Sequence, residues 1–114
     1  MRDDQQRLLD ILDSIKQIEK YAVRGKEAFE QDELIQNWII RQFEMIGEAC
    51  RAISNELRAQ YPTVPWKDWI GMRNILVHHY FEIDLGAVWS GVEHDLPQLK
   101  LQISTLLSAL PLEE

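Results

Sequence analysis

The chain has 114 residues, 46% of them apolar and 27% charged, a composition typical of one soluble globular domain. Its formal net charge of −7 argues against tight, sequence-independent binding to DNA. No apolar run approaches the roughly 20 residues that a membrane-spanning helix needs, and the charged N-terminal segment lacks the apolar stretch of a secretory signal. Cys50 is the only cysteine, which excludes an internal disulfide and favours a reducing, cytoplasmic setting.

Apolar residues recur at helical spacing, and the sequence predicts an all-α, up-and-down bundle of four main helices. The first helix runs from about Asp3 to Ala22 and ends before Gly25. Asp3 and Asp4 suit its N-terminus, because carboxylates there meet free amides and the positive end of the helix dipole.

The second and longest helix is expected from about Asp32 to Gln60. Its apolar positions cover about half the circumference, so it should contact more than one neighbouring element. Gly47, at the margin of this apolar arc, suggests a close approach by another helix. We expect the following arc residues to lie in the core: Leu34, Ile35, Trp38, Ile39, Phe43, Met45, Ile46, Ala49, Cys50, Ile53 and Leu57.

Two further helices follow a break at residues 61–65. The third is short, from about Trp66 to His79, and the last begins after Asp84 and runs to about Leu110. Pro97 lies inside the last helical pattern and predicts a kink near residues 93–97. Packing explains the remaining tryptophans, Trp66, Trp69 and Trp89, whereas His94 should face solvent.

Residues 71–80 place Arg73, Asn74, two histidines and Tyr80 on the third helix and its exit. On a helical wheel His78 falls roughly 140° from Arg73, on the polar side beside Asn74. His79 falls inside the apolar arc, so we expect it to be packed with a local hydrogen bond. Tyr80 returns towards Arg73 if the helix continues that far. The core face of this helix should consist of Trp69, Met72, Ile75 and Leu76.

A histidine beside an arginine suits phosphoryl chemistry, because imidazole exchanges protons near neutral pH and guanidinium binds phosphate oxygens. RNA supplies its own nucleophile, the 2′-hydroxyl, so such a pair could cleave it without a metal ion. The same spacing also fits a plain helix end with a solvated arginine and a histidine that satisfies the dipole. Spacing alone leaves both interpretations open.

The pattern Arg73-x4-His78-x-Tyr80 resembles the signature of HepT-like toxins, a branch of the HEPN ribonuclease superfamily. The likeness extends over nearly the whole chain and includes residues 43–49, Pro65-Trp66, residues 71–74, Val88-Trp89 and residues 95–99. It implies a HEPN-like fold and a homodimer in which two motifs face one cleft. It also implies metal-independent cleavage of RNA, including tRNA, and no cofactor.

The resemblance also assigns roles to residues. Arg73 and His78 match the catalytic pair, and Asn74 matches the polar residue that follows the arginine. Tyr80 matches a tyrosine that a partner nucleotidyltransferase, acting as antitoxin, modifies with AMP. Such a group would place bulk and negative charge beside the pair and block an RNA phosphate. The family register agrees with the wheel in favouring His78 over His79.

Two alternatives remain at this stage. Asp10 and Asp13, or Glu44 and Glu48, could pair to bind a metal, but neither pair has a His or Cys at ligand spacing, which favours a solvated or salt-bridged face. Glu48 could instead orient Arg73. The rival function is a catalytically silent helical module that binds a nucleotidyltransferase or a nucleotide.

Overall fold

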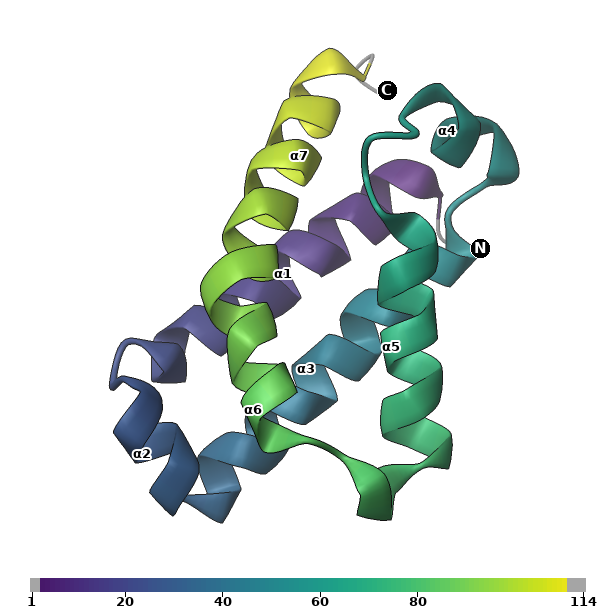
Figure 1. Ribbon diagram of the computed structural model, residues 1–114. Coiled ribbons are helices and arrows are strands. Elements are labelled where there is room, and N and C mark those ends of the chain that lie inside the picture. Colours follow the sequence, from purple (N-terminus) through teal and green to yellow (C-terminus); the bar gives the residue numbers. More distant parts are fainter. Residues whose placement is uncertain (1–2, 111–114) are drawn as a thin grey trace.

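The computed structural model describes residues 3–110, and within that range every regular element is helical. Two long antiparallel helices, α1 (Asp4–Ala22) and α3 (Glu33–Ala52), pack against each other. Figure 1 shows α5 (Trp66–His78) and α7 (Leu96–Ala109) crossing this pair, with α5 packed on α3 and α7 on α1. The predicted all-α bundle of four main helices is confirmed. None of the helices within residues 3–110 is both long and apolar enough to cross a lipid bilayer.

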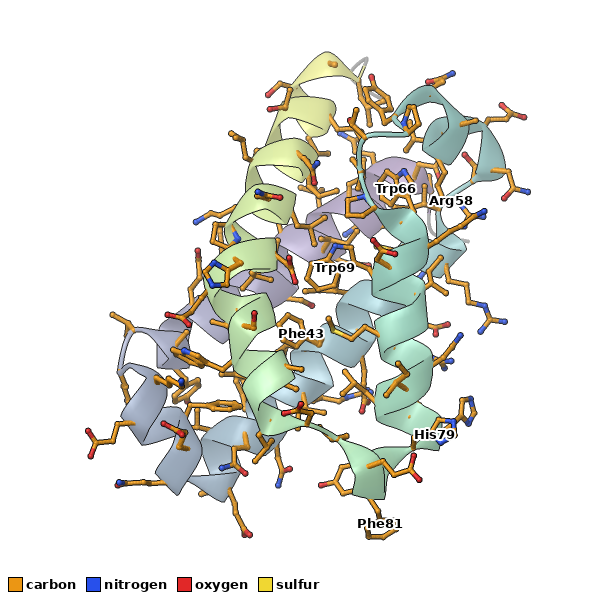
Figure 2. All side chains as sticks on the ribbon, in the orientation of Figure 1. Phe43, Arg58, Trp66, Trp69, His79 and Phe81 are labelled. Atoms are coloured by element: carbon orange, nitrogen blue, oxygen red, sulfur yellow. The ribbon has the colours of Figure 1, made fainter. Side chains whose placement is uncertain are left out.

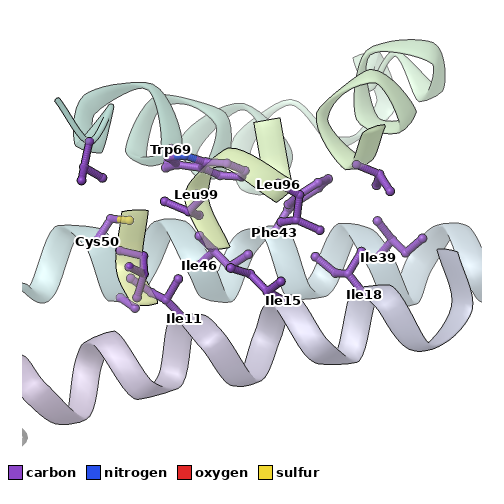
Figure 3. Packing of buried hydrophobic residues seen from close by; sticks show 14 of the residues in the cluster. Ile11, Ile15, Ile18, Ile39, Phe43, Ile46, Cys50, Trp69, Leu96 and Leu99 are labelled. Carbon is purple, nitrogen blue, oxygen red and sulfur yellow. The ribbon is translucent and has the colours of Figure 1, made fainter. Parts of the chain in front are cut away.

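The core lies between the four main helices and uses most of the predicted apolar positions (Figure 3). The rings of Phe43 and Trp69 join α3 to α5, with centroids 5.6 Å apart. Cys50 is fully buried, and that burial raises the pKa of its thiol to about 12. Trp38 stays at the edge, where its indole Nε1 donates to the Gln17 carbonyl at 2.9 Å.

A few residues expected in the core are exposed instead. They are Leu34, Met45 and Ile75. Each lies at the margin of its helix's apolar arc, where the neighbouring helix no longer covers it.

The prediction of one helix over residues 32–60 is wrong, because this segment forms two helices. α3 ends at Ala52, and α4 (Asn55–Gln60) begins after Ser54. The Ser54 hydroxyl accepts the Leu57 amide at 3.2 Å and donates to the Asp4 carboxylate at 2.6 Å. This N-cap supplies a new helix start, and Asp4 fixes the break against α1.

Two other connections differ from the expected boundaries. A short helix, α2 (Lys26–Gln31), follows Gly25 and buries Phe29 in the core. The expected last helix divides into α6 (Leu85–Ser90), a π-helical turn over residues 91–95 and α7. The kink predicted near residues 93–97 stays a prediction; the helix there contains this π-helical turn, which ends two residues before Pro97 and fits its missing amide hydrogen.

Candidate active site

Arg73 lies where α5 comes closest to α3, directly over Gly47. A Cβ atom built on Gly47 would lie 2.3 Å from the Arg73 Cβ and 2.7 Å from the Trp69 carbonyl oxygen. No side chain fits there, so the close helix approach suggested by this glycine is present. The contact fixes the base of the Arg73 side chain.

The guanidinium of Arg73 is held on two sides. Its Nε lies 3.2 Å from the Glu48 carboxylate, and its Nη1 donates to the Asn74 Oδ1 at 3.1 Å. The contact anticipated between Glu48 and Arg73 is thus present. The Nη2 group makes no hydrogen bond to the part of the chain that the structure describes, so the guanidinium keeps donors for a ligand.

His78 is the last residue of α5 and is exposed. It lies one helical turn after Asn74, so the two share the outer face of the helix. Within residues 3–110 its imidazole makes no hydrogen bond, and none joins it directly to Arg73. Asn74 thus contacts the guanidinium of Arg73 and shares a helix face with His78.

The prediction for His79 is wrong. α5 ends at His78, and His79 adopts a non-helical backbone with φ −126° and ψ 43°. Its side chain is 60% exposed, lies 3.5 Å from the Glu82 carboxylate and points away from the bundle (Figure 2). The wheel placed it in the apolar arc only because it assumed another helical residue.

Tyr80 opens a 3-10 turn over residues 80–82 and does not lie on α5. Its phenol donates to the Asn37 Oδ1 on α3 at 3.2 Å, and half of the residue is exposed. The next residue, Phe81, is fully exposed and extends from the tip of the molecule (Figure 2). Asn37 was missed in the sequence, because no local signal connects positions 43 residues apart.

A cavity of about 550 Å³ opens beside Arg73 and is called here the α1–α3–α5 groove. It brings together both carboxylate pairs considered in the sequence. Its lining consists of Arg7, Asp10, Asp13, Ser14, Arg41, Glu44, Met45, Glu48, Ala49, Arg73 and Val77.

The two α3 carboxylates that line the groove each have an arginine partner. Glu44 lies 3.3 Å from Arg41, and Glu48 is bound to Arg73. The expected salt-bridged face is present on this helix. Across residues 3–110, His, Cys, Asp and Glu side chains form no group of three or more that could hold a metal ion.

Most of the chain is similar to proteins of one described family. The model of a family described as "Ribonuclease HepT-like" matches residues 11–106. The Methanocaldococcus jannaschii protein named "Putative RNase MJ1380" is 39% identical over 103 residues, which cover 90% of this chain and 94% of that protein. The Thermococcus cleftensis protein named "Probable ribonuclease HepT" is 37% identical over 94 residues, covering 82% and 86% respectively.

A second Methanocaldococcus jannaschii protein, "Gamma-glutamylcyclotransferase and putative RNase MJ0434", is 39% identical over 101 residues, 88% of this chain and 46% of that protein. No solved structure gave a significant match. The family model covers most of the helical bundle, including the segment that carries Arg73 and His78. The chain belongs to the HepT-like ribonuclease family and is a ribonuclease.

Proposed function

We propose that this chain is the toxin of a toxin–antitoxin pair, a metal-independent endoribonuclease acting on tRNA or mRNA through Arg73 and His78. The geometry of Arg73 carries the proposal. Glu48 and Asn74 fix the guanidinium, its Nη2 donors have no partner within residues 3–110, and the exposed His78 follows one turn after Asn74. A preorganised cation and an accessible imidazole on the same helix suit a phosphodiester whose negative charge grows during reaction.

The proposed reaction uses the RNA's own 2′-hydroxyl. His78 accepts the proton of that hydroxyl, whose oxygen forms a bond to phosphorus as the bond to the 5′-oxygen breaks. A protonated imidazole returns a proton to the departing 5′-oxygen. Arg73 stabilises the added charge on the phosphoryl oxygens, and Asn74 positions the phosphate or the imidazole. The products are a 2′,3′-cyclic phosphate and a 5′-hydroxyl.

A homodimer would supply the second imidazole and a second Arg73 to the same cleft, raising the local positive potential on an acidic chain. The exposed apolar side chains near the end of α5 support this arrangement. Ile75 and Val77 are exposed on different faces of α5, at 54% and 41%, and Phe81 is fully exposed beyond the end of the helix. Exposed apolar side chains of this kind are typical of surfaces that another protein covers.

Tyr80 is the proposed site of AMP addition by a partner nucleotidyltransferase acting as antitoxin. Its hydroxyl is held by Asn37, and the residue is half exposed, so an enzyme could reach the oxygen. An added AMP would place bulk and negative charge within two residues of His78 and repel an RNA phosphate.

Labelled tRNA and mRNA incubated with the purified protein in EDTA test the reaction. We expect cleavage with 2′,3′-cyclic phosphate ends, lost in Arg73→Ala and His78→Ala. His94→Ala and Arg51→Ala, at exposed positions outside the groove, should cleave normally. A strict requirement for a divalent cation contradicts the mechanism. Binding of RNA or a nucleotide by a parent protein that cleaves nothing supports the catalytically silent alternative.

Mixing inactive chains tests the shared cleft. If each cleft uses groups from both protomers, Arg73→Ala and His78→Ala chains mixed after partial unfolding should regain part of the activity, because hybrid dimers hold one intact arginine and one intact histidine. Sedimentation should show a dimer. A monomer that remains fully active contradicts this part of the proposal.

A further inference from the structure

Most of the α1–α3–α5 groove has no part in the proposed cleavage. The proposed reaction uses Arg73 and its partner Glu48, and the cavity of about 550 Å³ is also lined by Arg7, Asp10, Asp13 and Ser14 of α1. Binding pockets for small ligands typically fall between about 300 and 1,000 Å³, so the groove has room for a group the size of a nucleoside.

The charged side chains of the groove are only partly paired with one another. Two arginines on α3 and α5 are neutralised by the neighbouring Glu44 and Glu48. The guanidinium of Arg7 has no ion pair or hydrogen bond within residues 3–110, and its Nε is buried without a partner. Among the interactions within residues 3–110, none joins the carboxylate of Asp13 to a donor, whereas Asp10 accepts from Gln6 at 3.4 Å. The Arg7 cation and the Asp13 carboxylate on α1 therefore remain for a ligand.

The same cavity has an apolar component. Met45 and Val77 line it and are both exposed, while Ala49 adds a small apolar surface between the charged groups. The groove would bind a second phosphate poorly, because its three arginines lie among four carboxylates. A neutral, flat group with apolar faces and hydrogen-bonding edges fits better. In single-stranded RNA that group is an unstacked base.

We infer that the α1–α3–α5 groove takes the base flanking the cleaved bond and prefers guanine. Guanine combines two acceptors, O6 and N7, with the donors N1–H and N2–H₂. Arg7 can donate to the acceptors, and Asp13 can accept from the donors. Uracil offers no amino group to the carboxylate. The inference rests on the proposed function, since Arg73 at the groove edge holds the neighbouring phosphate.

Equilibrium binding tests the inference separately from cleavage. The probes are fluorescent 2′-O-methyl oligouridines, which cannot be cut through a 2′-hydroxyl, carrying one guanine, adenine, cytosine or inosine. Inosine lacks only the 2-amino group of guanine. We expect the guanine probe to bind about tenfold more tightly than the inosine probe, within the range for one bidentate base contact. Asp13→Ala should bring that ratio close to one. Arg7→Met should reduce the preference for guanine over uracil.

Glu93→Ala removes an exposed carboxylate outside the groove and serves as the matched control, with the guanine preference retained. Cleavage of the corresponding 2′-hydroxyl oligonucleotides is measured in parallel. Equal binding of all probes, no binding, or a guanine preference that survives both groove variants overturns the inference. Selective binding without cleavage supports guanine binding in the groove and refutes the proposed nuclease mechanism. Cleavage without any base preference supports the mechanism and refutes guanine binding in the groove.

Discussion

Replacing Gly47 by alanine tests the close contact that places Arg73. The new methyl group would lie 2.3 Å from the Arg73 Cβ, whereas ordinary contact begins at 3.4 Å. The second neighbour, at 2.7 Å, is the backbone oxygen of Trp69, which cannot rotate away. α3 and α5 must therefore separate by about an ångström, and overpacking of this kind costs about 3 kcal/mol.

The change also replaces a helical glycine by alanine, and this replacement by itself stabilises a helix by about 1 kcal/mol. The net loss is therefore about 2 kcal/mol, or a fall in Tm of about 8 °C for a domain of this size. Urea and thermal unfolding followed by circular dichroism measure both quantities. Because Arg73 moves with α5, cleavage should fall even where the variant is fully folded.

Gly71→Ala is the matched control, since it lies on α5 with no atom within 4 Å of the built Cβ. It should gain up to about 1 kcal/mol from helix propensity and keep its activity. If Gly47→Ala proves as stable as Gly71→Ala, the helix contact is looser than the structure indicates and the argument for Arg73 fails.

Three further predictions concern single residues. Glu48→Gln should reduce cleavage about tenfold by loosening Arg73. Chemical denaturation should show a stability change below about 1 kcal/mol, because the ion pair is partly exposed. Unchanged cleavage would show that Glu48 does not position Arg73. His79→Ala should alter the free energy of unfolding by less than about 0.5 kcal/mol and cleave normally, unlike His78→Ala, since His79 is exposed; loss of cleavage in folded His79→Ala reverses the assignment. Burial raises the pKa of the Cys50 thiol from 9.0 to about 12, so iodoacetamide should alkylate it only after unfolding in urea, as mass spectrometry can show. The folded state should also weaken as pH rises from 9.0 towards 12, because the unfolded thiol releases its proton first; alkylation of the native chain at neutral pH contradicts this burial.

Helical periodicity predicted the main helices and most of the core, because burial of one face of each long helix dominates their packing. Gly47 and Glu48 were also informative, since both lie where the face of α3 meets another helix. The break at Ser54 was not predicted. It depends on Asp4, which lies 50 residues away in sequence.

The candidate site was predicted in part. The wheel correctly placed His78 on the outer side of α5 with Asn74, but it carried the helix one residue too far and misplaced His79. Arg7 and Asn37 were not recognised, because their significance comes only from helices that meet in space. The catalytic roles of Arg73 and His78 rest on the family motif and on the proposed chemistry.

Because Tyr80 is hydrogen-bonded to Asn37, covalent modification of the tyrosine would have a second effect. Esterifying the phenolic oxygen of Tyr80 removes its only proton, so the hydrogen bond from Tyr80 to the Asn37 Oδ1 is lost. Within residues 3–110, no other side-chain hydrogen bond ties the turn over residues 80–82 to α3. Attachment of a nucleotide would therefore untether this corner of the protein as well as obstruct it, and faster amide exchange there would report the modified state.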